Sequence, residues 1–134
     1  MKNIPLIVQV PIEITSENIQ NLLTSAFEGG ANYWVRSVNL DRSDNPPKPG
    51  LVWWGTDEVF EGDFEATITF DDPDGDEGNG EGSAKLTWES IHRGLRVMAR
   101  KEPHHFADVI RNDTDAVTGD VFMQCALLGG VVYG

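Results

Sequence analysis

Apolar and polar positions follow two periods along this chain, and the shorter period predicts strands. It is clearest at 64–70, where every second residue is apolar and the residues between are polar. A strand with one buried and one wet face has this pattern. Two runs rich in β-branched or aromatic residues, at 4–10 and 31–38, indicate two more strands. Residues 51–54 form another short apolar segment, which we expect to be buried.

The longer period predicts helices. Thr15 or Ser16 can cap a first helix, and Gly29-Gly30 is expected to stop it in the left-handed conformation. The apolar stripe of this helix is Ile19, Leu22, Leu23, Ala26 and Phe27.

Three further helices are expected in the second half of the chain. Thr87 can cap one that runs to about Lys101. Pro103 stops it and begins a short helix over 103–110, with Phe106, Val109 and Ile110 facing inward. The last helix is expected to run from about 117 to 128 and to end at Gly129-Gly130.

Early strands and late helices predict an α+β fold, with a small antiparallel sheet packed on one face by three to four helices. A chain of 134 residues has the length of one domain, spanning 1–134. A proline-rich loop is expected at about 41–50, and a mobile acidic loop at about 71–83. The apolar residues 129–134 either dock as a final strand or lie in a subunit interface, which leaves a homo-oligomer open.

Charge is the least ordinary property of the sequence. Asp and Glu total 22 against 10 Lys and Arg, so the formal net charge is −12. The resulting field repels nucleic acid and anionic lipid from most of the surface, and neither is expected as a direct partner. The single Cys125 excludes an internal disulfide framework. No targeting signal or apolar stretch of about 18 residues is apparent, so a cytoplasmic protein is expected.

The acidic residues are concentrated between 57 and 81, where eleven of them occur without a Lys or Arg. A solvated loop is one interpretation. Calcium binding by Asp72, Asp74 and Asp76 is another, but an EF-hand would need Gly at Glu77 and Glu at Ser83. In a third, the carboxylates imitate a polyanion and bind a basic groove. The residues assigned to this partner surface are Asp71, Asp72, Asp74, Asp76, Glu77 and Glu81.

Two adjacent tryptophans could anchor the same partner. If the segment at 51–54 is a strand, Trp53 and Trp54 face opposite sides, and one of them lies outside the core. An exposed tryptophan is a common anchor in protein interfaces. We expect Trp34 and Trp88, which lie in periodic elements, to pack in the core.

Three arginines at 93, 96 and 100 form a stripe opposite the apolar face of the 87–101 helix. Arg93, Arg96 and Arg100 either pair with the acidic loop or bind an anion such as a phosphate or nucleotide. The three histidines and Cys125 form no metal-binding pattern, and no motif for a nucleophile or phosphate loop is present. We therefore expect no bound metal, no other cofactor and no catalytic activity.

Three segments together carry a resemblance to a known group of proteins. They are Glu28–Trp34, Leu86–Ile91 with Gly94-Leu95, and His105–Asp108 running into Asp115–Cys125 and the final Tyr133-Gly134. In these segments the chain resembles a family of small uncharacterised proteins of bacteriophages and prophages. The resemblance implies a cytoplasmic accessory protein made during infection or carried by a prophage, and it implies no catalytic residues.

Taken together, these features predict a non-catalytic, acidic, phage-type accessory protein. It would bind and inhibit a host protein with a basic groove, such as a nucleic-acid-handling or defence complex of the CRISPR or restriction type, by imitating DNA. The alternative is a small-ligand binder, such as a sponge for a signalling nucleotide, that uses Arg93, Arg96 and Arg100.

Overall fold

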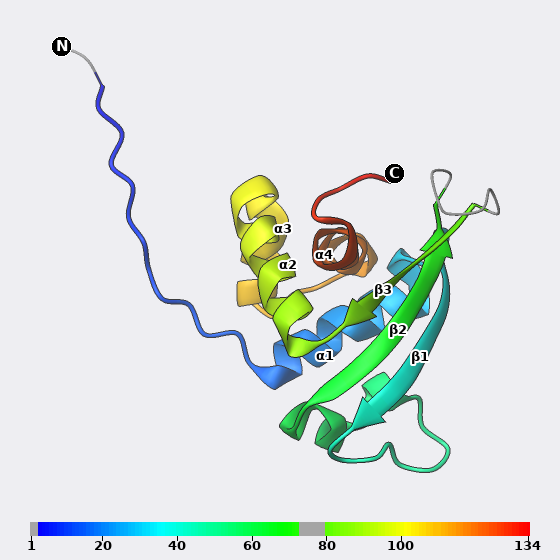
Figure 1. Ribbon diagram of the computed structural model, residues 1–134. Coiled ribbons are helices and arrows are strands. Elements are labelled where there is room, and N and C mark those ends of the chain that lie inside the picture. Colours follow the sequence, from blue (N-terminus) through cyan, green and yellow to red (C-terminus); the bar gives the residue numbers. More distant parts are fainter. Residues whose placement is uncertain (1–2, 73–79) are drawn as a thin grey trace.

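The computed structural model describes residues 3–72 and 80–134, and these form an α+β fold (Figure 1). The described strands, β1 (Val35–Ser43), β2 (Phe64–Asp71) and β3 (Glu81–Leu86), form one antiparallel sheet in the order β1-β2-β3. Helices gather on one face of this sheet (Figure 1). The described α-helices are α1 (Ser16–Ser25), α2 (Trp88–Lys101), α3 (Pro103–Ile110) and α4 (Ala116–Leu128). The predicted fold class is confirmed.

The central strand β2 has the alternating burial that its sequence predicts. Phe64, Ala66, Ile68 and Phe70 are buried against the helices, and the residues between them are half-buried. Because residues directly opposite in an antiparallel pair share a face, β2 sets the inward face of both neighbouring strands.

The bounds of the other two strands differ from the prediction. β3 was expected to be loop up to about residue 83, yet Glu81, Gly82 and Ser83 pair with the end of β2. These residue types have little strand propensity, so the pairing overrides it. β1 begins at Val35 rather than Ala31 and extends to Ser43, into the segment predicted to be a proline-rich loop.

The predicted helix starts are confirmed at atomic detail. The Thr15 and Thr87 hydroxyls accept the backbone N–H of Asn18 and Ser90 and cap α1 and α2. The carboxylate of Asp115, which the sequence analysis did not single out, caps α4 in the same way. Each cap satisfies an N–H group that the first turn of a helix leaves unpaired.

The helix ends agree less well with prediction. α4 ends at Gly129, as expected, and this residue is in the left-handed conformation. The left-handed stop predicted at Gly29-Gly30 is wrong, because a π-helical turn, η1 (Ala26–Gly30), follows α1 instead. Ile110 was expected to face inward from α3, but it is 47% exposed.

One hydrophobic cluster joins the sheet to the helices, and Trp34, Phe122 and Met98 are among its fully buried members. Two glycines permit the close packing of α4. A Cβ on Gly94 of α2 would lie 2.7 Å from the Ala126 Cα, and one on Gly119 would lie 2.6 Å from the Ala26 nitrogen. Any larger residue at either position would force the helices apart.

Two short 3-10 helices connect β1 to β2. The first, η2 (Trp53–Gly55), and the second, η3 (Asp57–Glu61), both contact α1. The predicted burial of the 51–54 segment is therefore only partly right. Trp53 is buried and Trp54 is half-buried, whereas Leu51 and Val52 lie on the surface.

Residues 3–14 form an extended arm that leaves the body of the protein at the start of α1 (Figure 1). The strand predicted at 4–10 is wrong as a strand of this sheet, because none of these residues pairs with β1, β2 or β3. Ile4 is 81% exposed, and Leu6 and Ile7 are each 89% exposed. Pairing requires a neighbouring strand, and the sequence of the segment alone does not supply one.

Candidate functional site

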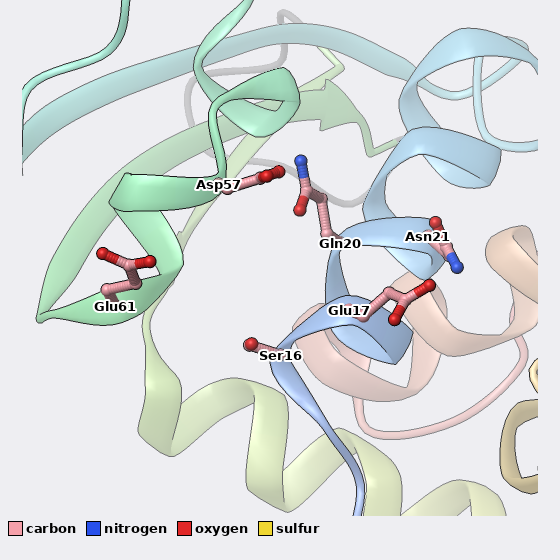
Figure 2. A pocket seen from close by; sticks show the side chains of 6 residues that line it. All are labelled: Ser16, Glu17, Gln20, Asn21, Asp57 and Glu61. Atoms are coloured by element: carbon pink, nitrogen blue, oxygen red, sulfur yellow. The ribbon is translucent and has the colours of Figure 1, made fainter.

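An acidic pocket of about 490 Å³ lies between α1 and η3 (Figure 2). Ile19, Leu22 and Leu23 hold the inner face of α1 in the core, so the opposite face of that helix lines the pocket. On η3, Val59 and Phe60 are buried in the same core. The lining side chains are Ser16, Glu17, Gln20, Asn21, Asp57 and Glu61.

The three carboxylates of this pocket belong to exposed residues. Glu17, Asp57 and Glu61 form no ion pair with a cation of the described chain. Lys48 lies near the rim but pairs with Glu58, at 3.0 Å between Nζ and Oε1. Its pKa is raised mainly by that contact with Glu58, with smaller contributions from Asp57 and Glu61. One lysine is therefore shared among several carboxylates, and the pocket keeps a negative field.

Amide and hydroxyl groups complete the pocket lining. Figure 2 shows the Gln20 amide and the Asp57 carboxylate on facing sides of the hollow. Such groups can accept the fork of an arginine or the ammonium of a lysine from a partner. The arrangement has the chemistry to bind cationic side chains.

The carboxylates predicted to bind a partner fall into three groups. Asp71 and Glu81, at the paired ends of β2 and β3, both form ion pairs with Arg36. These two charges are therefore partly neutralised within the chain. The backbone N–H of Asp72 donates to the Gly80 carbonyl at 2.6 Å. The remaining predicted residues, Asp74, Asp76 and Glu77, lie outside the described residues.

The tryptophan pair differs from the arrangement expected of a strand. Trp53 is only 7% exposed, so its ring is not a surface anchor in this structure. Trp54 is half-buried, packs edge-on against Phe27 at 5.2 Å between centroids, and donates its indole N–H to Glu28 at 2.7 Å. A 3-10 turn places the two rings at a right angle, and only Trp54 reaches the surface.

The predicted arginine stripe lines a second pocket of about 490 Å³ on α2, together with Val97. Arg93, Arg96 and Arg100 form no ion pair with any acidic residue whose position is described. Arg93 donates to the Ala126 carbonyl at 3.5 Å, near the last turn of α4. That contact places the positive charge of Arg93 near the negative end of the α4 dipole, which stabilises the helix and gives Arg93 a structural role.

A partly buried polar network around Asp120 and Gln124 was not predicted from the sequence. Asp120 accepts hydrogen bonds of 2.7 Å from the Trp34 indole and the Tyr33 hydroxyl. Gln124 accepts the backbone N–H groups of Val132 and Tyr133, at 2.7 and 2.8 Å.

This network fixes the carboxy-terminal segment against the core without making it a strand. The Tyr133 ring stacks on Trp34 at 5.3 Å between centroids. Burial and the hydrogen bond to Asp120 raise the pKa of Tyr33 to about 12. A tyrosine that holds its proton so firmly is a hydrogen-bond donor rather than a base. A polar pair at i and i+4 within the apolar 117–128 helix is the one sequence signal that could have indicated this network.

The described residues contain no arrangement typical of a metal site or an activated nucleophile. No group of three or more His, Cys, Asp or Glu side chains among them is placed to hold a metal ion. Cys125 is buried, and burial raises the pKa of its thiol to about 11, which suppresses the reactive thiolate. Within 3–72 and 80–134, no helix is both long and apolar enough to cross a membrane.

In comparison with known proteins, no family model, curated protein or solved structure matches this chain.

Proposed function

We propose that this protein is a non-catalytic binding protein that uses surface carboxylates to engage a partner protein with a basic groove. The observation that carries the proposal is the set of three carboxylates around one pocket, Glu17, Asp57 and Glu61, none of which forms an ion pair with a described cation. The proposal places the main contact on the α1–η3 face, with Trp54 as a neighbouring half-buried aromatic surface.

The overall charge supports the same proposal. With a net charge of −12, the chain attracts basic surfaces over long range, and a partner built to hold phosphates offers the densest ones. We further propose that this partner is a host protein that handles nucleic acid or acts in defence, and that the chain is a phage-type accessory protein of the cytoplasm. The resemblance described above motivates the biological setting.

The proposal can be tested by capture from a bacterial lysate followed by competitive elution. The immobilised protein is expected to retain partners that a short DNA duplex releases, because both ligands would occupy the same groove. The variant Glu17→Gln/Asp57→Asn/Glu61→Gln is expected to lose them.

A charge-matched control separates the pocket from net charge. Asp41→Asn/Glu65→Gln/Asp108→Asn also removes three negative charges, but from residues that pair with Lys85 or Arg111. This control should retain its partners. Equal retention by both triple variants, or partners that DNA does not release, would contradict the proposal.

The arginine pocket supports a second candidate, binding of a phosphate-bearing small ligand. Three guanidinium groups line one hollow without an ion pair to a described acid, in a protein where acids outnumber bases. Planar guanidinium forks suit phosphate oxygens.

Thermal unfolding with a panel of nucleotides tests this second candidate. A specific ligand at a hundredfold excess over its dissociation constant should stabilise the fold by about 2.7 kcal/mol and raise the melting temperature. Arg96→Gln/Arg100→Gln should abolish the shift. Arg42→Gln/Arg111→Gln, which removes two arginines that do not line this pocket, should leave it intact. If no nucleotide shifts the wild-type protein, the candidate fails.

A further inference from the structure

The arm has the pattern of an edge strand that lacks its sheet. Every even-numbered position from 4 to 14 is apolar: Ile4, Leu6, Val8, Val10, Ile12 and Ile14. In an extended chain these six side chains share one face. Ile14 packs on the core, and with Ile12 it lines an apolar groove beside Trp88 and Leu95. The base of the arm is therefore anchored, while residues 4–10 remain exposed.

The prolines of the arm distinguish its two backbone edges. Pro5 and Pro11 are both at odd positions, so the odd-numbered edge lacks two N–H donors. In a strand, even-numbered residues direct N–H and C=O groups to the opposite edge. That edge is complete from Ile4 to Val10. Edge strands carry proline on the side that faces solvent, so the arm is suited to pair along its even edge only.

The chain also contains a matching acceptor. β3 pairs with β2 alone among the described strands and lies at one border of the sheet (Figure 1). Its register with β2 is continuous, whereas the opposite border strand, β1, has two irregularities that disfavour further pairing. On the helix-facing side, β3 presents the small residues Gly82 and Ala84, both half-buried. Large aliphatic side chains on an added strand could cover them.

Charge and surface area point to a second copy of this chain as the source of that strand. Residues 3–12 carry no charged side chain, so the arm itself adds no like-charge repulsion when it approaches another acidic molecule. The chain exposes 8224 Å², whereas a compact monomer of 14.8 kDa exposes about 7,000 Å². An interface of standard size, which buries roughly 800 Å² per partner, would fit within this excess of about 1,200 Å² per chain.

We propose that two copies exchange their arms, each adding residues 4–10 as a fourth strand beside β3 of the other. The even face of the arm then lies over the helix-facing side of the sheet, and the proline edge ends the sheet. Reciprocal exchange forms a closed, two-fold dimer rather than a fibre. This inference does not depend on the acidic pocket or on the arginine pocket.

Two single proline substitutions test the exchange. Val8→Pro removes an N–H from the complete edge, whereas Gln9→Pro removes one from the edge that already carries Pro5 and Pro11. Both changes lie outside the helices and strands, so circular dichroism should show a folded body in each variant. Light scattering after size exclusion should give twice 14.8 kDa for the wild type and for Gln9→Pro, and 14.8 kDa for Val8→Pro.

Amide hydrogen exchange gives an independent measurement on the wild type. The amides of Leu6, Val8 and Val10 should be protected in the dimer, and those of Ile7 and Gln9 should exchange freely. A wild-type protein that stays monomeric would overturn the proposal. A dimer that Val8→Pro leaves intact, or arm amides without the two-residue periodicity, would overturn it too.

Discussion

Trp34 and Trp53 are both buried, so each brings an indole N–H into the core, and the two N–H groups differ in their hydrogen bonding. The Trp34 N–H donates to Asp120 at 2.7 Å. The Trp53 N–H has no hydrogen-bond partner within the described part of the protein. A buried donor without a partner costs about 1–3 kcal/mol, whereas a hydrogen bond to a charged group stabilises by about 1.5–3 kcal/mol.

This contrast predicts unequal effects of the same substitution. Trp34→Phe removes a satisfied donor and leaves Asp120 with one bond fewer, whereas Trp53→Phe removes an unsatisfied donor. Both variants lose similar volume, so Trp34→Phe should lower the free energy of unfolding by about 1–3 kcal/mol more than Trp53→Phe. Urea denaturation measures the difference. An equal or larger loss for Trp53→Phe would show that its indole N–H does have a partner.

The tryptophan pair also shows how far individual residues could be predicted. Their apolar character indicated burial, and Trp53 is buried. The orientation of Trp54 could not be derived, because it depends on η2 packing against Phe27, which is 26 or more residues earlier in the chain. The acidic pocket was missed for the same reason. Glu17 and Asp57 are distant in sequence, and only the packing of α1 on η3 brings them together.

At the scale of elements, the cap of α4 links stability to pH. The Thr118 backbone N–H is the main cause that lowers the pKa of Asp115 below its usual value. A carboxyl group with a lowered folded-state pKa stabilises the fold above its unfolded pKa. That stabilisation is lost as the pH falls through the folded pKa.

Asp115→Asn and Asp115→Ala separate the charge from the cap. At neutral pH, Asp115→Ala should cost about 1 kcal/mol of unfolding free energy, and Asp115→Asn, which can still cap, should cost less. As the pH falls below about 4, the ordinary pKa of aspartate, and on through the lowered folded-state pKa, the advantage of the wild type over Asp115→Asn should shrink. Urea denaturation at each pH measures this. An advantage that grows on acidification would contradict the assignment.

Close packing of α2 on α4 predicts how a substitution at Gly94 changes stability. Alanine is about 1 kcal/mol better than glycine inside a helix. Gly94→Ala should nevertheless destabilise the protein, by about 1–3 kcal/mol, because the new Cβ would meet the Ala126 backbone. Thermal or urea unfolding tests it. A stabilised Gly94→Ala variant would mean that α2 and α4 are less tightly packed than described.

Elements with a strong internal period were predictable, and elements that depend on a neighbour were not. The alternation in β2 and the caps of α1 and α2 are local, and the structure confirms them. β3 has weak strand propensity and exists because β2 pairs with it. The arm has strong strand propensity and no neighbour within the described chain. Propensity alone therefore misassigned both segments.

For the whole molecule, the fold holds some of its charges within ion pairs and leaves others available. Arg36 pairs with Asp71 and Glu81 at one end of the sheet, and Lys85 pairs with Asp41. The carboxylates around the α1–η3 pocket and the arginines along α2 take no part in such pairs with described residues. Net charge could be computed from the sequence, but this division between paired and available charges needed the fold.

Salt dependence follows from that division. Binding of a basic partner at the pocket would depend on exposed charges, which salt screens over about 8–10 Å at physiological ionic strength. Raising the salt concentration should therefore weaken the wild-type complex steeply and weaken the pocket variant's residual binding much less. Titrations at several salt concentrations measure this. Salt-independent wild-type affinity would indicate an apolar contact instead.

The most direct measurement is the affinity of one purified captured partner for three forms of the protein, compared at a single salt concentration. The account predicts that Glu17→Gln/Asp57→Asn/Glu61→Gln binds at least tenfold more weakly than the wild type, a loss of about 1.4 kcal/mol or more. It predicts that Asp41→Asn/Glu65→Gln/Asp108→Asn binds like the wild type. Equal affinities for the two triple variants would contradict the claim that the α1–η3 pocket is where this protein holds its partner.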